Sequence, residues 1–402
     1  MGRGGRPVSP SRTIAVVSVS RSDYGHLRPL LEAVRAGGDL RLVLLVAGMH
    51  LVPDFGLTVR EIEADGWHIA ERIELLEADD SPAGIAASTG RGVAGFGRAY
   101  ARQRPDVVVL LGDRFEMLAA AVAALPFALP VAHIHGGEVS EGAMDNQIRH
   151  AITKLAHLHF ASAEVHARRI LAMGEEAWRV HTVGAPGLDR LARMSDVTRV
   201  DLAAELGLDP ARPWLLATFH PVTLEYRATA EHVGELLAAL EKVEGEIVIT
   251  YPNADTAGRI IIDRIEEFAA HHPRVHLARN LGEGRYLSLL RHAAVMVGNS
   301  SSGLIEAPSV GLPVVNVGSR QRGRLRGANV IDTACRREEI LHGIETALAP
   351  GFREGLAGRP NPYGDGRAAA RIVEVLRSAP LDERLIQKRF ADGGGARAGE
   401  AR

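Results

Sequence analysis

Cysteine is almost absent from this 402-residue sequence, which contains only Cys335. A single thiol excludes disulfides within the chain and metal sites built from several thiolates. Long apolar runs are also missing, since no window approaches the ~18 consecutive apolar residues of a membrane-spanning helix. The opening residues, MGRGGRPVSPSR, lack the apolar core of a secretion signal. We therefore expect a cytoplasmic protein with no membrane partner.

An excess of charge of one sign is lacking as well. The formal net charge is −2 with 24% charged residues, which removes the bulk electrostatic reason to expect a nucleic-acid partner. A hydrophobic content of 46% is typical of a soluble globular protein. The length is too great for one ordinary core and predicts two domains.

The stretch at residues 106–150 contains two short apolar runs, 107–112 and 130–134, separated by an Ala-rich helical segment. Such runs are typical of strands buried on both faces of a parallel sheet, and ligands bind at the carboxyl ends of such strands. Each run ends abruptly in polar residues, which predicts acid and base chemistry at this edge. The candidates are Asp113, Arg114, His133, His135, Glu138 and Asp145.

Strands and helices are expected to alternate along the whole chain. In the first half we expect strands at 13–20, 40–46, 69–73 and 180–184, and helices at 27–36, 83–102, 146–156 and 163–173, with Asp145 capping the third. In the second half we expect strands at 213–219, 246–251, 275–278, 295–298 and 313–317, and helices at 228–243, 257–271 and 285–293. Two such series predict an α/β protein of two Rossmann-like domains facing each other across a cleft.

The second half holds a candidate phosphate site, GNSSSGLIEAPSVG at 298–311. A strand there leads through Ser301, Ser302 and Gly303 into a helix, which would direct backbone N–H groups and hydroxyls at a diphosphate. Glu306, expected in the first turn, could accept hydrogen bonds from ribose, and Arg320 follows the next strand. The alternative is that the serines only cap the helix and Glu306 only complements its dipole.

Two further patterns bear on cofactor and metal binding. Gly90, Gly92 and Gly95 match a dinucleotide fingerprint by letter, but they lie inside an expected helix with no preceding strand. His133 and His135 would alternate along a strand and point to opposite faces, which disfavours a shared metal.

His220 ends an expected strand beside Pro221, at the cleft edge, where a structural or a chemical role is equally open. Asp113 could be a buried partner of Arg114 or Arg149.

Taken together, the motifs resemble the hydrolysing UDP-N-acetylglucosamine 2-epimerases of sialic-acid-type sugar synthesis. The resemblance spans residues 14–332 and rests on long contiguous motifs. They are SRSDYG at 20–25, AGMHLVPDFG at 47–56, LLGDRFE at 111–117, HIHGGEVSEGAMD at 133–145, IRHAITKLAHLHF at 148–160, FHPVT at 219–223, YPNADT at 251–256, GNSSSGLIEAPS at 298–309 and GSRQRGRLRGANVID at 318–332.

The resemblance implies a GT-B-like fold with domains at 1–190 and 191–366, a C-terminal helix at about 367–390 packing back on the first domain, and a disordered tail at 391–402. It also implies conversion of UDP-N-acetylglucosamine and water to N-acetylmannosamine and UDP through a 2-acetamidoglucal, without a cofactor or metal. The family further suggests a homo-oligomer, either a dimer or a tetramer.

Site residues are also implied by the resemblance. The catalytic candidates are Asp113, Glu138, Asp145, His135 and His220, and the substrate-binding candidates are Arg21, Asp23, His50, Arg114, Arg149, Ser301, Ser302, Gly303, Glu306 and Arg320. At position 135 this sequence has histidine where non-hydrolysing relatives and the animal enzyme resemble each other in having glutamate. That difference looks like the bacterial hydrolysing branch and leaves the assignment of base and acid open.

Three alternatives remain. The same chemistry could act on UDP-2,4-diacetamido-2,4,6-trideoxyglucose on a legionaminic-acid route, with Met49, His50 and Phe55 among the residues that would decide the sugar. A GT-B glycosyltransferase would need an acceptor groove and would not need the acidic residues. A non-catalytic sugar-nucleotide sensor would need Ser301 and Ser302 but would tolerate the loss of Asp113.

Overall fold

A computed structural model describes residues 12–79, 81–139, 144–193, 197–252, 258–279 and 281–392. Residues 140–143 of the acidic motif, residues 253–256 of YPNADT and the predicted tail from residue 393 onward lie outside the described residues. The chain forms two compact units. The N-terminal unit contains residues 1–138, 144–189 and 366–402, and the C-terminal unit contains residues 139–143 and 190–365.

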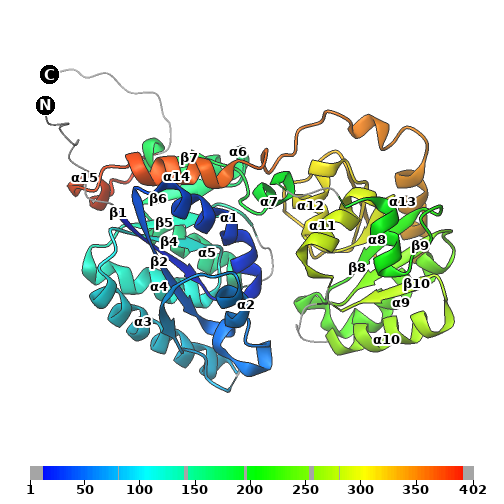
Figure 1. Ribbon diagram of the computed structural model, residues 1–402, viewed down its shortest axis with the longest axis horizontal. Helices are drawn as coiled ribbons and strands as arrows, with labels where there is room; N and C mark the ends of the chain where they lie inside the picture. The colour runs from blue at the N-terminus through cyan, green and yellow to red at the C-terminus, as the bar shows by residue number, and fades with distance from the viewer. Residues whose placement is uncertain are drawn as a thin grey trace, which may run out of the picture. The chain divides into compact units, whose positions relative to one another are not determined.

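The N-terminal unit is built on a seven-stranded sheet in the order β3-β2-β1-β4-β5-β6-β7, and every neighbouring pair is parallel (Figure 1). Its strands are β1 Arg12–Ser18, β2 Leu40–Ala47, β3 Ile69–Ile73, β4 Val107–Leu111, β5 Val131–Ile134, β6 Leu158–Ala161 and β7 Val180–Thr182. Its main helices are α1 Arg21–Gly37, α2 Val59–Ala64, α3 Pro82–Gln103, α4 Phe115–Ala124, α5 Met144–Leu155, α6 Glu164–Ala172, α14 Ala368–Ser378 and α15 Glu383–Ile386.

Side chains that point alternately to the two faces of the sheet fill two separate hydrophobic cores in this unit. Ile14 and Val16 of β1 pack on one face with α1 and α14, whereas Ala15 and Val17 pack on the other face with α3, α4 and α5. The same alternation holds along β4, whose five residues are all buried. A strand with no polar face is what a doubly covered parallel sheet requires. Helix α14 packs against α1, so the chain's end belongs to this unit (Figure 1).

The C-terminal unit repeats the plan with a six-stranded parallel sheet in the order β10-β9-β8-β11-β12-β13. Its strands are β8 Trp214–Thr218, β9 Glu246–Thr250, β10 Val275–Ala278, β11 Val295–Gly298, β12 Val314–Val317 and β13 Val330–Thr333. Its helices are α8 Arg199–Leu206, α9 Thr229–Glu241, α10 Gly258–His271, α11 Gly282–His292, α12 Ser302–Ile305 and α13 Arg337–Leu348, and α7 Leu188–Arg193 begins in the N-terminal unit. One core lies under α9, α10 and α13, and the other lies under α8 and α11.

The rejected glycine fingerprint is confirmed as part of a helix, because Gly90, Gly92 and Gly95 all lie within α3. Gly92 and Gly95 are buried there, where an added Cβ would come within 2.9 Å of Ala119 and 2.6 Å of Ile73. These glycines therefore allow close packing against α4 and β3. Among the described residues, no helix is both long enough and apolar enough to cross a bilayer.

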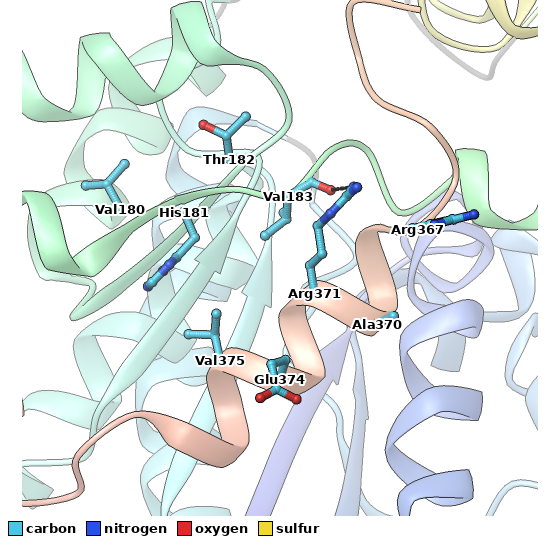
Figure 2. A pocket seen from close by; sticks show the side chains of 9 residues that line it. All are labelled: Val180, His181, Thr182, Val183, Arg367, Ala370, Arg371, Glu374 and Val375. Atoms are coloured by element: carbon cyan, nitrogen blue, oxygen red, sulfur yellow. Dashed lines mark hydrogen bonds between the residues drawn. The ribbon is translucent and has the colours of Figure 1, made fainter.

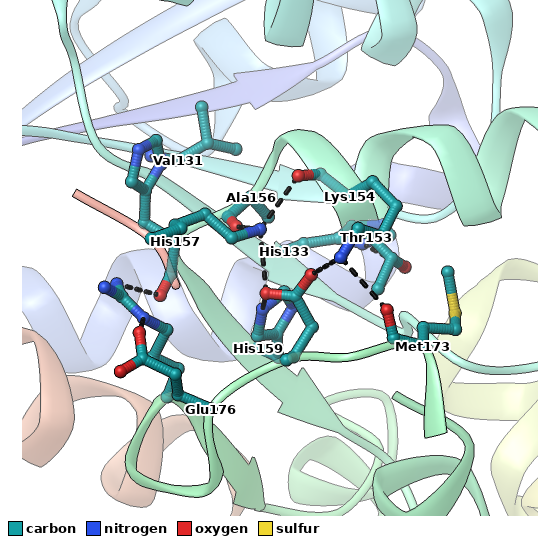
Figure 3. Close-up of polar contacts among 12 residues, drawn as sticks. Val131, His133, Thr153, Lys154, Ala156, His157, His159, Met173 and Glu176 are labelled. Atoms are coloured by element: carbon teal, nitrogen blue, oxygen red, sulfur yellow. Dashed lines mark hydrogen bonds and ion pairs between the residues drawn. The ribbon is translucent and has the colours of Figure 1, made fainter. Parts of the chain in front are cut away.

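A charged cluster fastens the C-terminal segment to the N-terminal unit at the end of α5. The Glu175 carboxylate is 1% exposed and lies 2.5 Å from Lys154 Nζ, 2.7 Å from Lys388 Nζ and 3.1 Å from His159 Nε2. Lys388 Nζ also donates to the carbonyls of Lys154 and Ala156 (Figure 3). One buried carboxylate thus links three segments that are distant in the sequence.

We predict that Glu175→Gln weakens this link and removes the loss of folding stability that Glu175 causes at acidic pH. Burial raises the pKa of Glu175, but His159, Lys154 and Lys388 outweigh it and bring the pKa from 4.5 down to about 2. The stabilisation is therefore complete above about pH 4.5 and is lost as the pH falls towards 2, amounting to at most about 3 kcal/mol. Denaturant unfolding of wild type and variant across this range checks it. The exposed Glu164→Gln is the matched control, and an unchanged acid dependence in Glu175→Gln would contradict the link.

Candidate active site

One buried arginine, Arg149 of α5, holds the carboxyl ends of β4 and β5 together. Its side chain is 5% exposed and pairs with the carboxylate of Asp113, which follows β4. Its Nη1 atom donates a 2.9 Å hydrogen bond to the carbonyl of His135 and lies 3.7 Å from Glu138 Oε2. Of the two arginines that the sequence offered as partners of Asp113, the structure selects Arg149 over Arg114.

His135 and Glu138 form a buried pair directly after β5. His135 Nδ1 lies 2.6 Å from Glu138 Oε1, and Ser162 Oγ, directly after β6, donates a 2.5 Å hydrogen bond to the same oxygen. Burial favours the neutral carboxyl, but the hydrogen bond from His135 and the charge of Arg149 hold the pKa of Glu138 well below its ordinary value. Glu138 is therefore an ionised carboxylate whose hydrogen-bond partners fix its orientation.

The expectation that His133 and His135 alternate along one strand is wrong. Strand β5 ends at Ile134, and His135 has a left-handed backbone with φ of 65°. The His133 ring lies instead 2.7 Å from the carbonyl of Gly112, and burial lowers its pKa to about 3. The two rings have different partners because the chain leaves the strand between them.

Gly137 explains why the chain can turn at this point. It has φ of 74°, and a Cβ at this position would lie 2.4 Å from the carbonyl oxygen of His166. Only glycine allows the loop after β5 to pass so close to α6. This close approach brings Glu138 beside Ser162 and His166.

Asp145 lies inside α5 and does not cap it. The helix begins at Met144, so Asp145 occupies its first turn, where a carboxylate also complements the helix dipole. Burial and the nearby charge of Asp113 raise the pKa of Asp145, although Arg114 and Arg149 oppose the shift. Asp145 thus retains a proton more readily than an ordinary aspartate.

A second group surrounds Arg114 at the ends of β1 and β2. Arg114 Nη2 lies 3.1 Å from Glu116 Oε1 and 3.1 Å from the sulfur of Met49. His50 is buried between Ser18 and Thr58, whose hydroxyls lie 2.8 Å from its Nε2 and Nδ1 atoms. Burial lowers the pKa of His50 to about 4, so the ring is neutral at pH 7.

The segment after β1 differs from the expected turn before a helix at residue 27. Helix α1 begins at Arg21, and the Ser20 hydroxyl accepts a hydrogen bond from the N–H of Asp23. Because Ser20 caps the helix, α1 begins six residues before the predicted start at residue 27. The apolar periodicity alone did not indicate this earlier start. Arg21 is exposed, with its Nε 3.4 Å from Glu61 Oε1, whereas Asp23 is buried.

In the C-terminal unit, Asn299 connects the predicted residues of three loops. Its side chain exchanges hydrogen bonds of 2.7 and 2.8 Å with the backbone N–H and carbonyl of His220. Its own carbonyl accepts from Arg320 Nη1 at 3.1 Å and from Gln321 Nε2 at 2.7 Å. Burial, with the charge of Arg320, lowers the pKa of His220 to about 3. The loops after β8, β11 and β12 therefore meet at one buried amide.

The serine segment forms a shorter helix than expected. Helix α12 contains only Ser302–Ile305, so Glu306 ends it and the expectation of Glu306 in a first turn is wrong. The N–H of Ser302 already donates to Ser300 Oγ, and that of Gly303 donates to the Ser300 carbonyl. A four-residue helix has only a weak dipole. A diphosphate here would therefore have to be bound mainly by side chains, including the serine hydroxyls.

The sequence-based prediction did not include several residues of these clusters. Glu116 is fully buried beside Arg114, and Asn299 is fully buried beside His220. Both lie inside recognised motifs, LLGDRFE and GNSSSGL, which was the available signal. Ser162 was missed because the four-residue strand β6 before it contains a histidine and follows a helix, so no apolar run marks it.

A hollow of about 700 Å³ lies elsewhere, between β7 and α14 (Figure 2). The nine described residues that line it include none of the predicted site residues. Arg371 donates a 3.0 Å hydrogen bond to the carbonyl of Val183 at its rim. The predicted residues instead gather in two places, those of the N-terminal unit around Arg149 and Arg114, and those of the C-terminal unit around Asn299 and α12.

Comparison with known proteins places these motifs among sugar-nucleotide epimerases. The UDP-N-acetylglucosamine 2-epimerase family matches residues 32–377. The chain is 39% identical over 378 residues to the hydrolysing UDP-N,N'-diacetylbacillosamine 2-epimerase of Legionella pneumophila, covering 94% of this chain and 98% of that protein. It is 35% identical to the hydrolysing GDP/UDP-N,N'-diacetylbacillosamine 2-epimerase of Campylobacter jejuni, covering 95% and 99%. It is 33% identical to the UDP-N-acetylglucosamine 2-epimerase of Neisseria meningitidis, again covering 95% and 99%.

Solved structures show the same fold. The Neisseria meningitidis UDP-GlcNAc 2-epimerase bound to UDP-GlcNAc matches with a TM-score of 0.78 at 18% identity, covering 91% of this chain and 99% of that one. The Methanocaldococcus jannaschii enzyme in complex with UDP-GlcNAc and UDP matches with a TM-score of 0.74 at 18% identity, with the same coverage. This likeness confirms the predicted α/β class, with two Rossmann-like domains of GT-B type.

We predict that Asp23→Asn stabilises the protein at neutral and alkaline pH. Burial raises the pKa of Asp23 from 3.8 to about 6, so the folded state prefers the protonated carboxyl. Stability is therefore lost as the pH rises from about 4 to about 6, by about 3 kcal/mol, and the asparagine variant avoids this loss. Unfolding of both proteins at pH 4 and pH 8 checks it. The surface variant Asp39→Asn is the control, and equal pH dependence in all three proteins would refute the expectation.

Proposed function

The chain belongs to the hydrolysing branch of the UDP-N-acetylglucosamine 2-epimerase family, and we propose that it hydrolyses a UDP-2-acetamido sugar with inversion at C2. The observation that carries the proposal is the group of acidic and imidazole side chains that Arg149 holds at the ends of β4 and β5. Acid and base groups at this place suit proton transfer at a sugar carbon, whereas a nucleotide sensor would not need them.

The preferred substrate is UDP-N,N'-diacetylbacillosamine, also written UDP-2,4-diacetamido-2,4,6-trideoxyglucose. Two relatives that carry this sugar in their names are 39% and 35% identical to the chain. UDP-N-acetylglucosamine is the second candidate, because a 33% identical relative is named for it. The products would be UDP and the 2-epimeric free sugar, for use in the synthesis of sialic-acid-type sugars.

The proposed chemistry begins with elimination. The bond between C1 and the diphosphate oxygen breaks with its electron pair, the C2 proton passes to a base, and the C2–H electrons form the C1=C2 double bond of a glycal. Water then adds its oxygen to C1, while C2 receives a proton from the opposite face. Inversion requires one group that accepts a proton and another that donates one. Asp113, His135, Glu138 and Asp145 provide this set, and the raised pKa of Asp145 suits the donor.

The C-terminal unit would bind the nucleotide. Ser301, Ser302 and Gly303 would contact the diphosphate, Glu306 the ribose, and His220 and Arg320 would add donors and charge. Fixed donors stabilise the charge that develops on the leaving diphosphate without reorganising. From the N-terminal unit, Arg21, Asp23, His50 and Arg114 would complete substrate binding.

Incubation in D2O tests the function directly. Each of the two UDP-sugars is supplied separately, and UDP release, the free sugar and deuterium at C2 are measured. We expect UDP, the 2-epimeric sugar with deuterium at C2, and a higher kcat/KM for the diacetamido substrate. Products without deuterium would overturn the elimination mechanism. Transfer to an added acceptor would indicate a glycosyltransferase, and binding without UDP release would indicate a sensor.

We predict that Asp113→Asn lowers kcat by at least about 100-fold, because it removes a charged group beside the reacting carbons. The dissociation constant for UDP should stay unchanged, since UDP binding is assigned to the C-terminal unit. Turnover and calorimetric UDP binding measure the two effects. Asp39→Asn, another ion-paired aspartate of the same unit, serves as the control. Normal turnover by Asp113→Asn would make the acidic cluster structural.

We predict the opposite pattern for Ser302→Ala. Loss of one hydroxyl donor should weaken UDP binding by about 1 kcal/mol, or roughly fivefold in Kd. Calorimetry with UDP measures this effect. The control is Ser288→Ala, because Ser288 is also buried in the same unit and its hydroxyl donates to the carbonyl of Gly284. Equal Kd values for the two variants would remove Ser302 from the diphosphate site.

A further inference from the structure

A line of hydrogen bonds runs from α6 to His135. His166 Nδ1 lies 2.9 Å from Ser162 Oγ, Ser162 Oγ lies 2.5 Å from Glu138 Oε1, and Glu138 Oε1 lies 2.6 Å from His135 Nδ1. All four residues are buried, and none is more than 9% exposed. Ser162 and His166 belong to none of the recognised motifs, so their contacts with Glu138 need an explanation of their own.

The directions of these hydrogen bonds follow from the charge of Glu138. An ionised carboxylate only accepts, so the single hydroxyl proton of Ser162 points to Glu138 and Nδ1–H of His135 also donates to it. Ser162 Oγ must then accept from Nδ1–H of His166. Burial lowers the pKa of His166 to about 4, so this ring is neutral and its proton lies on Nδ1. Because Nδ1–H of His135 donates to Glu138, Nε2 is the ring nitrogen that remains to accept a proton.

The backbone holds the His135 ring in the same place. Its left-handed φ of 65° is unfavourable for a residue with a side chain. Two hydrogen bonds maintain it, from its N–H to the carbonyl of Phe160 at 3.1 Å and from Arg149 to its own carbonyl at 2.9 Å. A strained residue fixed from several sides is characteristic of a group whose orientation matters for function.

We infer that Ser162 and His166 are positioning residues, which fix Glu138 so that His135 presents an unprotonated Nε2 that exchanges the C2 proton. The inference rests on the proposed function. It assigns the base to His135 and makes Glu138 its orienting carboxylate, as a carboxylate orients a catalytic imidazole elsewhere. In elimination, Nε2 takes the C2 proton, the C2–H electron pair becomes the new double bond, and the C1–O pair leaves with UDP.

Charged and titratable groups from four parts of the fold surround this pair. Arg149 of α5 and Asp113 after β4 pair with each other beside it, and Arg169 of α6 donates to the carbonyl of Gly137. His166 of α6 lies 3.8 Å from Glu138, and the ring of His26 of α1 lies 6.3 Å from that of His135, edge to face. Of these groups only His166 is seen in hydrogen-bond contact with Ser162, so a change at Ser162 tests the hydroxyl with the other groups unaltered in sequence.

The test is the pH profile of kcat/KM for UDP release. Removing the Ser162 hydroxyl leaves Glu138 with one donor fewer, so it interacts more strongly with a protonated His135. Ser162→Ala should therefore move the acidic limb upward by about one pH unit and lower kcat about tenfold, with the Kd for UDP unchanged. His166→Leu should do the same, and His166→Gln, which retains an N–H donor, should restore part of the loss. Ser88→Ala, another buried serine of this unit, is the control.

Two outcomes would overturn the inference while leaving the proposed function intact. One is a lower unfolding temperature in Ser162→Ala and His166→Leu with kcat and acidic limb equal to those of Ser88→Ala, which would show a structural role only. The other is read from ring nitrogen NMR of histidine-labelled protein, with His135 assigned from the signals lost in His135→Gln. Protonated Nδ1 and unprotonated Nε2 are expected, and the reverse tautomer would refute the inference even if no UDP were released. Wild-type protein that releases UDP from neither sugar would refute the proposed function instead.

Discussion

The pairing of Arg149 with the groups around it is the interaction on which the N-terminal site depends. One guanidinium contacts a carboxylate after β4 and a carbonyl after β5, and it lies near a second carboxylate. Removing a partner from such a buried set costs about 3–5 kcal/mol, because the remaining charge has no water to solvate it. The two carboxylates would repel each other without this cation. The acid and base groups can therefore be concentrated in one place only because Arg149 reaches them from α5.

The parallel sheets explain why the functional residues follow strands that look so similar. With both faces buried, β1, β4 and β5 have few polar side chains to place along their length, so chemistry is confined to the loops at their ends. In the N-terminal unit these loops carry the charged groups. In the C-terminal unit Asn299 joins three equivalent loops through neutral amide hydrogen bonds. The same architecture thus presents charged side chains in one unit and amide hydrogen bonds in the other.

Much of the fold could be predicted from the sequence, because buried parallel strands leave a strong apolar pattern. The strands at 69–73, 275–278 and 295–298 have the predicted bounds. The short strands β6 and β13 were missed, since four residues with histidine or aspartate do not form a recognisable run. The candidate residues were found through motifs, yet their partners were not. A left-handed backbone at His135, or a serine that reaches Glu138 across 24 positions, depends on tertiary packing that no local pattern encodes.

Unfavourable ionisation and backbone states are concentrated at one end of the N-terminal sheet. Asp23, Asp145 and the backbone of His135 are each held in states that an isolated residue would avoid, and all three lie at the carboxyl end of one sheet. Elsewhere in the same unit, two lysines and a histidine contact Glu175, and these contacts outweigh its burial and lower its pKa. The proton transfer proposed above needs carboxyls with separated pKa values, and burial raises the pKa of a carboxyl by destabilising its charged form. At the other end of α5, Lys154 joins the Glu175 cluster, so the helix that carries Asp145 and Arg149 in its first half also has its last turn held by an ion pair.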